Sequence, residues 1–482
     1  MSLFFAGLLA TATAGAAPFP IVETTSGAVR GFYPEPDLRA FLGIPYAQPP
    51  IGSLRFRSPE PVKEKAEGLI DATSFGFSCY QWRVGIVGAT ALSPTTGESE
   101  NCLTLNVWAS AGHSEHPKPV LVWMHGGTFT EGSTSVPMYD GQYLAVAHPD
   151  IIVVTVNYRV NVFGFANSPA VPEKNVGLRD QRLAVEWLRD NIAAFGGDPD
   201  KMVLGGESAG AMGTGMFAYA YPDDPIVRGL IMESGEAPTM VPDDGTLWAS
   251  LTETLGCESS DPTEELTCMQ GVDGYALKRT LSPNELNPYS SPPKTNPTVD
   301  NVTYFGPVGY AALSAAGKFA RLPALRGINN NEGNVLVEFT PEGGPVNQTL
   351  ADWLTEIGFN CPAAAEASVW AAHDIPSWRY RYFGEFPSLM MYDWMGAYHG
   401  SEVALLLGTT DNVRIRDSQP NEREAQKYFQ DAVVSFIKDP VQGLEDFGWP
   451  VYNPNTTSLV ELFKDSLPNA TFEEGAAYDG AC

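Results

Sequence analysis

Three short apolar segments restrict the fold of this chain more than any other feature. They are PVLVWMHGG (119–127), IIVVTVNYRV (151–160) and MVLGGESAG (202–210), and each runs into a glycine-rich or polar break. Strands that are apolar throughout, rather than alternating with polar residues, are typical of a sheet buried on both faces. The segments therefore predict a mostly parallel central sheet with helices on either side.

The stretch between the last two segments has the pattern of a helix. In GLRDQRLAVEWLRDNIAAFGG (177–197), Leu183, Trp187, Leu188 and Ile192 recur at helical spacing, and two glycines follow. A strand, a helix and a strand in this order predict a right-handed parallel crossover. A further helix is expected after residue 208, and then a strand in GLIMESG (229–235).

Beyond about residue 257 the regular patterns weaken, which indicates inserted loops rather than a linker between domains. We therefore predict the α/β fold class, with a single domain over residues 17–482.

Composition and charge limit the function. Hydrophobic residues make up 44% of the 482 residues and charged residues 18%, so the chain has enough apolar surface for a large core. Its formal net charge of −28 argues against binding nucleic acid or anionic membranes, because both are negatively charged.

Several features predict secretion. Residues 1–16 have the apolar run and small-residue cleavage pattern of a signal peptide, although they contain no Lys or Arg, and the run is too short to be a stable membrane anchor. Six cysteines without metal-ligand spacing favour disulfides over a metal site. Four N-x-[ST] sequences mark glycosylation candidates at Asn301, Asn347, Asn455 and Asn469.

The stretch GGESAGAMG (205–213) makes Ser208 a candidate nucleophile. With 47 glycines in the chain, a Gly-x-Ser-x-Gly pattern arises easily by chance, and a plain structural turn is the alternative. Here the pattern follows an apolar strand and precedes small residues suited to a close-packed helix. A sharp turn from strand to helix would leave the Ser208 hydroxyl exposed for attack.

A serine nucleophile needs a base and an acid that orients the base. If the chain order is serine, acid, histidine, only His373 and His399 come late enough. His399 is favoured because GAYHGSEV places it in a loop ahead of an apolar run, whereas His373 lies near a predicted helix end. Glu332, in GINNNEG, follows a short apolar stretch, but an exposed loop glutamate is the commoner explanation for such a residue.

The segment WMHGGTF (123–129) predicts a glycine-rich loop after a strand. Acyl transfer needs backbone N–H groups where the carbonyl oxygen of the substrate becomes an oxyanion, and glycines allow that close approach. A simple tight turn is the alternative.

These residues resemble the type B carboxylesterase and lipase family of α/β-hydrolases, which includes cholinesterases and fungal lipases. The resemblance extends over most of residues 20–480 and rests on FLGIPYAQPPIGSLRF, ESENCLTLNVW, WMHGGTF, NYRVNVFGF, the long segment from NVGLRDQRL to GGESAG, ALRGINNNEG and AYHGSEV. It implies that residues 17–482 form a single catalytic domain of the α/β-hydrolase fold, with insertions that form its pocket. The implied enzyme is a secreted hydrolase of fungal type that cleaves carboxylic esters through an acyl-enzyme, with no metal or organic cofactor and a small-molecule or lipid ester as substrate.

The resemblance also implies roles for single residues. Ser208 matches the nucleophile, Glu332 the acid and His399 the base. The oxyanion-hole positions are Gly126, Gly127, Thr128 and Ala209, and the positions that support the triad are Glu207 and Ser234. Thr128 replaces the third glycine that is commoner in the family. The implied disulfides are Cys79–Cys102, Cys257–Cys268 and Cys361–Cys482.

Within this family we expect a carboxylesterase that favours short to medium acyl chains. The alternative enzyme is a lipase whose loop between Cys79 and Cys102, with the run VGIVGATAL, acts as a lid at an oil surface. Some relatives are adhesion proteins that have lost the serine, but all three triad residues are present here.

Overall fold

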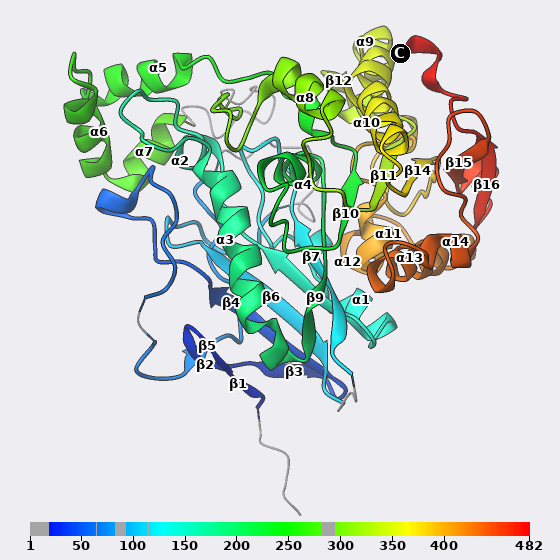
Figure 1. Cartoon of the computed structure of the whole chain (residues 1–482), viewed down its shortest axis with the longest axis horizontal. Coiled ribbons are helices and arrows are strands. Elements are labelled where there is room, and N and C mark those ends of the chain that lie inside the picture. The colour runs from blue at the N-terminus through cyan, green and yellow to red at the C-terminus, as the bar shows by residue number, and fades with distance from the viewer. Residues whose placement is uncertain (1–18, 64, 82–92, 113–115, 282–294) are drawn as a thin grey trace, which may run out of the picture.

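The computed structural model describes residues 19–63, 65–81, 93–112, 116–281 and 295–482 (Figure 1). The segment expected to be a signal peptide and the run VGIVGATAL lie outside the described residues. The largest sheet has 11 strands in the order β16-β15-β14-β11-β10-β9-β7-β8-β6-β4-β3. Its strands are β3 (Phe32–Glu35), β4 (Leu38–Pro45), β6 (Thr104–Ser110), β7 (Lys118–Met124), β8 (Ile152–Val156), β9 (Gly197–Glu207), β10 (Gly229–Glu233), β11 (Ala324–Asn329), β14 (Ser377–Tyr382), β15 (Thr457–Leu462) and β16 (Ala470–Glu474).

Seven neighbouring strands of this sheet pair in parallel, in the spatial order β15-β14-β11-β10-β9-β7-β8. The outer strands β16, β6, β4 and β3 pair antiparallel. The four strands predicted from the sequence are β7, β8, β9 and β10, and the prediction of a mostly parallel sheet is confirmed. Two small sheets accompany it, formed by β1 (Ile21–Thr24), β2 (Gly27–Arg30) and β5 (Ile70–Asp71), and by β12 (Phe339–Thr340) and β13 (Gly344–Pro345).

The uninterrupted apolar strands are explained by helices on both faces of the sheet. Along β7, Val120 and Val122 enter one core, whereas Leu121 and Trp123 enter the other. The first core packs against α3 (Val176–Asn191) and α4 (Ala209–Ala220), and the second against α11 (Val403–Leu407) and α13 (Pro420–Lys438). Both helices predicted from the sequence, α3 and α4, are confirmed.

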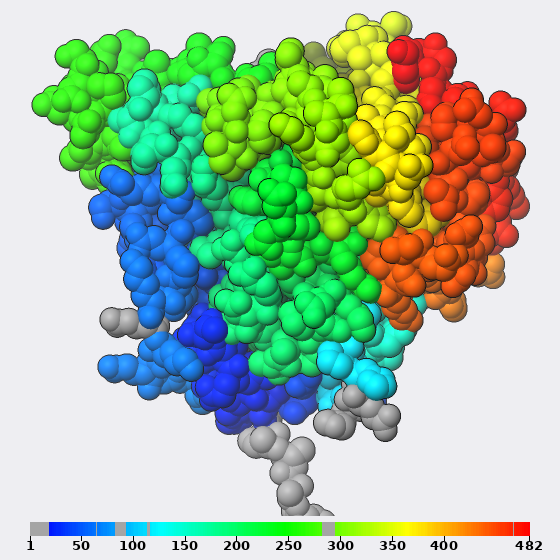
Figure 2. Space-filling view, in the orientation of Figure 1, coloured from blue at the N-terminus to red at the C-terminus, as the bar shows by residue number. Residues whose placement is uncertain are grey.

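The remaining helices lie around this framework. They are α1 (Gln142–Ala147), α2 (Asn161–Gly164), α5 (Thr246–Leu255), α6 (Pro262–Gly271), α7 (Gly274–Leu281), α8 (Gly306–Ala315), α9 (Gln348–Trp353), α10 (Cys361–Ala372), α12 (Thr410–Val413) and α14 (Gly443–Phe447). The residues of the C-terminal elements form one flank of the molecule, and those of the N-terminal strands lie at the opposite lower side (Figure 2).

The expectation of loops beyond residue 257 is wrong for α6 and α7. Leu266, Met269 and Leu277 from these helices are buried together with Trp248 in a small separate core. Short helices of this kind are stabilised by tertiary packing rather than by their own propensity, so their sequence signal is weak.

Three disulfides link segments of the described chain: Cys79–Cys102, Cys257–Cys268 and Cys361–Cys482. The last joins the start of α10 to the final residue, so the C-terminus is fixed to the body. Among the described residues, no helix is both long and apolar enough to cross a bilayer.

One buried ion pair connects the segment after β8 to α3. Arg159 donates from Nε to Asp180 Oδ2 at 2.8 Å and from Nη2 to Oδ1 at 2.7 Å, and its backbone N–H donates to the same carboxylate at 3.0 Å. Both side chains are almost fully buried. Removing one partner would leave the other charge buried without compensation.

We predict that Asp180→Ala lowers the free energy of unfolding by about 3 kcal/mol or more. Urea unfolding followed by circular dichroism measures this loss. Asp71→Ala, which breaks the solvent-exposed pair with Arg30, is the control and should leave the transition unchanged. Equal effects of the two substitutions would contradict the prediction.

Candidate active site

Ser208 lies at the turn between β9 and α4, with φ 56° and ψ −122°. This backbone conformation is strained for a residue with a side chain and persists only where the surroundings enforce it. The flanking glycines allow the turn to pack tightly. A Cβ on Gly206 would lie 2.6 Å from the Met124 carbonyl oxygen, and one on Gly210 would lie 2.1 Å from the same atom. The glycines at this turn are therefore required by the approach of β7.

Glu332 and His399 reach Ser208 from later segments of the chain. Glu332 begins the short 3₁₀ helix η6 (Glu332–Val335) after β11, and His399 lies in the loop before α11. His399 Nε2 is 2.9 Å from Ser208 Oγ, and its Nδ1 is 2.6 Å from Glu332 Oε2. Because the carboxylate accepts the Nδ1 proton, Nε2 is left as the acceptor for the serine hydroxyl. The structure thus brings together the three residues selected from the sequence.

The carboxylate of Glu332 is held on its other oxygen as well. Oε1 accepts from the Asn329 backbone N–H at 2.7 Å and from Ser234 Oγ at 2.5 Å. Gly333 is needed next to Glu332 because a Cβ there would lie 2.0 Å from the Ala351 carbonyl oxygen of α9. Glu332 is fully buried, so its orientation is determined by these bonds rather than by water.

Two residues that sequence reasoning missed also contact this site. The Asn329 side chain donates from Nδ2 to the Tyr398 carbonyl oxygen at 2.8 Å and to Glu402 Oε2. Glu402 is buried, and its Oε1 lies 3.5 Å from Ser234 Oγ. Asn329 lies in the quoted stretch INNNEG, and the run of three asparagines there was a signal that could have found it.

The glycine-rich loop after β7 packs directly against the nucleophile. A Cβ on Gly126 would lie 3.0 Å from Ser208 Cβ and 2.5 Å from Glu207 Oε2. The Gly126 N–H donates to the Tyr139 hydroxyl at 3.4 Å, which distinguishes it from Gly127 and Thr128 further along the loop. The start of this loop therefore lies in close contact with the Ser208 turn.

The remaining oxyanion-hole candidates have backbone conformations suited to this loop and turn. Gly127 has φ 107° and Thr128 φ 53°, and Ala209 is the first residue of α4, where the N–H has no acceptor within the helix. The exposed Thr128 hydroxyl is 2.6 Å from that of Thr130. The Thr128 side chain is thus engaged within its own loop.

Carboxylates control the charge of His399. Glu207 Oε1 lies 3.2 Å from His399 Nε2. Burial acts to lower the pKa of His399, but the negative charges of Glu207 and Glu332 outweigh burial and raise it to about 9. Burial raises the pKa of Glu207 to about 7, a rise that His399 opposes and Glu332 increases. The site therefore favours the imidazolium, which forms when His399 takes the serine proton.

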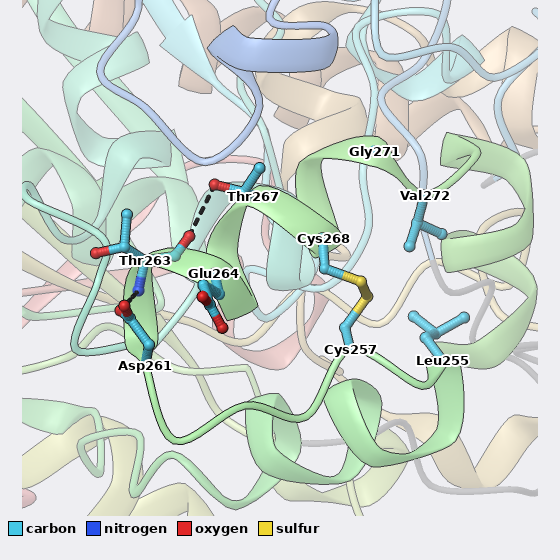
Figure 3. A pocket seen from close by; sticks show the side chains of 9 residues that line it. All are labelled: Leu255, Cys257, Asp261, Thr263, Glu264, Thr267, Cys268, Gly271 and Val272. Carbon is cyan, nitrogen blue, oxygen red and sulfur yellow. Dashed lines mark hydrogen bonds between the residues drawn. A yellow bond between two sulfur atoms is a disulfide. The ribbon is translucent and has the colours of Figure 1, made fainter.

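Other candidates lie away from this cluster. His373 follows α10, and its Nε2 is 2.9 Å from the Ser314 carbonyl oxygen. A cavity of about 670 Å³ lies by α5 and α6 around the Cys257–Cys268 disulfide, and none of the three triad residues lines it (Figure 3).

The described residues contain no group of His, Cys, Asp and Glu side chains arranged to hold a metal ion. The four candidate asparagines for glycosylation, Asn301, Asn347, Asn455 and Asn469, are exposed.

Comparison with known proteins agrees with the geometry of the site. A model of the carboxylesterase family matches residues 18–349 and 340–474. The chlorogenic acid esterase of Aspergillus niger is 38% identical over 440 residues, which cover 88% of this chain and 83% of the relative. Secreted lipase 5 of Gibberella zeae is 32% identical over 491 residues, which cover 94% of this chain and 91% of the relative. An acetylcholinesterase of Bungarus fasciatus is 31% identical over 524 residues, which cover 93% and 83%.

The family match extends over the whole described sheet and the site, and the mostly parallel sheet flanked by helices is that of the α/β-hydrolase fold. The resemblance stated from the sequence motifs is confirmed, and with it the assignment to the carboxylic ester hydrolases. This chain belongs to the carboxylesterase family.

Proposed function

We propose that this protein is a secreted serine hydrolase that cleaves carboxylic esters through an acyl-enzyme on Ser208. The observation that carries the proposal is the continuous hydrogen-bonded series from Glu332 through His399 to Ser208, with bonds of 2.6 and 2.9 Å. A nucleophile, a base within hydrogen-bonding distance and a group that orients the base are the parts that such catalysis needs.

In the first half of the reaction, Ser208 Oγ attacks the ester carbonyl carbon while His399 Nε2 takes the hydroxyl proton. The carbonyl oxygen becomes negatively charged, and the N–H groups of Gly127, Thr128 and Ala209 stabilise it. Gly126 lies beside them, but its N–H already has the Tyr139 hydroxyl as acceptor. His399 then returns the proton to the departing alcohol, and the acyl group stays on Ser208.

In the second half, water repeats the attack on the acyl-enzyme. His399 takes a proton from the water, and the acid leaves as Ser208 regains its own proton. Glu332 keeps the imidazole in one tautomer throughout, with Ser234 supporting the carboxylate, and Glu207 adds negative charge beside the imidazolium. This sequence of steps requires no metal or organic cofactor.

The substrate class is proposed from the relatives. The similarity to a chlorogenic acid esterase supports a small-molecule ester as the substrate, and we propose that its acyl chain is short to medium in length. The similarity to a secreted lipase supports the alternative, a lipase for long-chain acylglycerols. Both relatives are fungal and one is named as secreted, which supports an extracellular enzyme with glycans on the exposed asparagines. We do not expect the protein to bind nucleic acid or to be held by a stable membrane anchor.

We predict that Ser208→Ala lowers the rate of p-nitrophenyl acetate hydrolysis by at least about 10⁴-fold, because it removes the hydroxyl that forms the acyl-enzyme. The variant should keep the circular dichroism spectrum of the wild type. Ser53→Ala, which changes an exposed serine in another segment, is the control and should keep full activity. A folded Ser208→Ala enzyme with near-normal turnover would refute the proposed nucleophile.

Acyl-chain preference separates the two substrate classes. With p-nitrophenyl esters from acetate to palmitate, an esterase should show its highest kcat/KM at short to medium chains and no rise in rate above the solubility limit. A sharp increase in activity once the substrate forms a separate phase would instead establish the lipase.

The pH profile tests the charge balance at His399. The base must be neutral to take the serine proton, so kcat/KM should rise with pH and level off only above a midpoint near the His399 pKa of about 9. Glu207→Gln removes a negative charge that stabilises the imidazolium, and therefore the midpoint should move to lower pH. An unchanged or higher midpoint in Glu207→Gln would contradict this account.

A further inference from the structure

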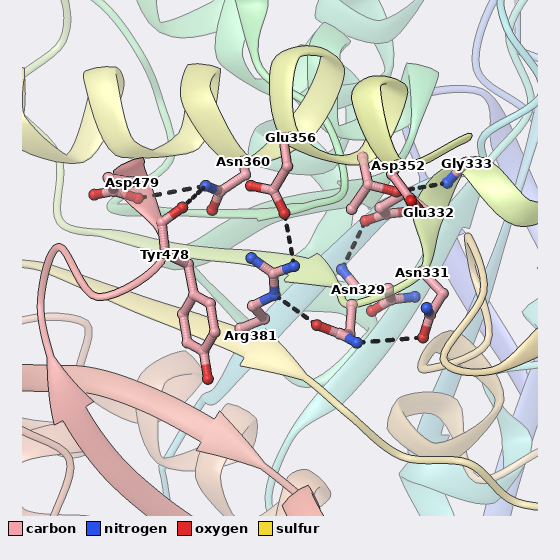
Figure 4. Close-up of polar contacts among 12 residues, drawn as sticks. Asn329, Asn331, Glu332, Gly333, Asp352, Glu356, Asn360, Arg381, Tyr478 and Asp479 are labelled. Atoms are coloured by element: carbon pink, nitrogen blue, oxygen red, sulfur yellow. Dashed lines mark hydrogen bonds and ion pairs between the residues drawn. The ribbon is translucent and has the colours of Figure 1, made fainter. Parts of the chain in front are cut away.

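Arg381 is a buried arginine near the triad that takes no part in the steps above. It lies on β14, the strand beside β11, and only 6% of its side chain is exposed. Figure 4 shows its guanidinium between the turn that carries Glu332, the helix that carries Glu356 and the ring of Tyr478. A buried guanidinium is costly unless it is paired, so its contacts identify what it holds.

The first contact is with the acid turn. Arg381 Nε donates to Asn330 Oδ1 at 2.9 Å. Asn330 stands between Asn329, whose backbone N–H binds Glu332, and Asn331, whose backbone N–H donates to the Ala397 carbonyl oxygen at 2.9 Å. Three successive asparagines therefore contact three different parts of the site. Asn330 binds Arg381, Asn329 binds Glu332, and Asn331 binds the loop before His399.

The second contact is with the π-helix η7 (Leu354–Asn360), which continues α9. Arg381 Nη2 donates to Glu356 Oε1 at 2.9 Å. One turn further on, the Phe359 ring packs against the His399 imidazole, with the ring centroids 5.1 Å apart. Single π-helical turns occur often at functional sites. Arg381 thus joins the turn that holds the acid to the helix that supports the base.

The third contact is with the C-terminal segment. The guanidinium lies over the Tyr478 ring at 4.5 Å. Asp479 holds this segment in place, because its Oδ1 lies 2.7 Å from Arg379 Nη2. The last residue of the segment, Cys482, forms a disulfide with Cys361, which directly follows η7. The C-terminal segment therefore packs Tyr478 against the guanidinium.

We propose that Arg381 is a positioning residue of the catalytic site, which keeps the Glu332 turn and the Phe359 face of η7 at a fixed separation so that His399 stays aligned with Ser208. The inference rests on the proposed hydrolase function. A displacement of a catalytic group by about 1 Å can lower the rate about 100-fold. A small shift of His399 after the loss of Arg381 is therefore enough to reduce turnover.

The test compares Arg381→Gln with Arg379→Gln in the full-length protein. Both substitutions remove a buried arginine from the same strand. Both residues contact the C-terminal segment and η7, Arg379 through Asn360 Oδ1 at 2.6 Å, so the two variants differ in the acid turn, which only Arg381 contacts. Both variants should lose thermal stability. Arg381→Gln should also lower kcat at least about tenfold with little change in KM, whereas Arg379→Gln should keep kcat near that of the wild type.

The pH profile separates positioning from charge. If Arg381 acted only through its positive charge, its loss would raise the pKa of His399. The hydrogen bond from His399 to Glu332 raises the pKa of His399, so a weaker bond would lower that pKa. Arg381→Gln should therefore move the midpoint of the kcat/KM profile to lower pH. Arg381→Lys, which keeps the charge, should restore part of kcat.

If Arg381→Gln does not fold, Glu356→Gln provides the test. Glu356 is partly exposed, and its substitution weakens the ion pair with Arg381, so it should lower kcat in the same way. Wild-type kcat and an unshifted profile in the folded variants would overturn the positioning role. An inactive wild-type protein would instead refute the proposed hydrolase function, so the two failures are distinguishable.

Discussion

The strained backbone turn at Ser208 requires the neighbouring strand and helix to pack very closely around the nucleophile. Its backbone enters a region that residues with side chains avoid, and it stays there because β7 and the following helix leave room for nothing larger than hydrogen at Gly206 and Gly210. The cost is of the order of 1–3 kcal/mol, and the packed centre of the sheet offsets it. The loop of Gly126 can approach the serine only because this turn is so tight.

The parallel sheet brings the other groups to the same edge. The carboxyl ends of β9, β10 and β11 lead to Ser208, Ser234 and Glu332, and the strand register places Glu207 opposite Glu233. Residues that are far apart in the chain meet there because neighbouring parallel strands end together. This arrangement explains why Ser234, from a strand without a catalytic residue of its own, reaches the acid.

The site gathers several carboxyl groups away from water. Glu207, Glu332 and Glu402 are buried around His399, and Glu233 is buried opposite Glu207 on the neighbouring strand. Burial raises the pKa of Glu402 to about 8 and that of Glu207 to about 7, so these groups hold protons more readily than exposed carboxylates do. Glu332 instead accepts three hydrogen bonds, which hold it in place as the partner of His399.

The sequence was sufficient to predict the strands that are apolar on both faces, the crossover helix and the turn at Ser208, because these depend on local periodicity and on glycines at close contacts. It also limited the base to two histidines by chain order. It could not select Glu332 from the residues alone, and it did not reveal Asn329, Glu402 or Arg381. Their roles come from contacts between segments that are distant in the chain, and these buried contacts form only when the chain is folded.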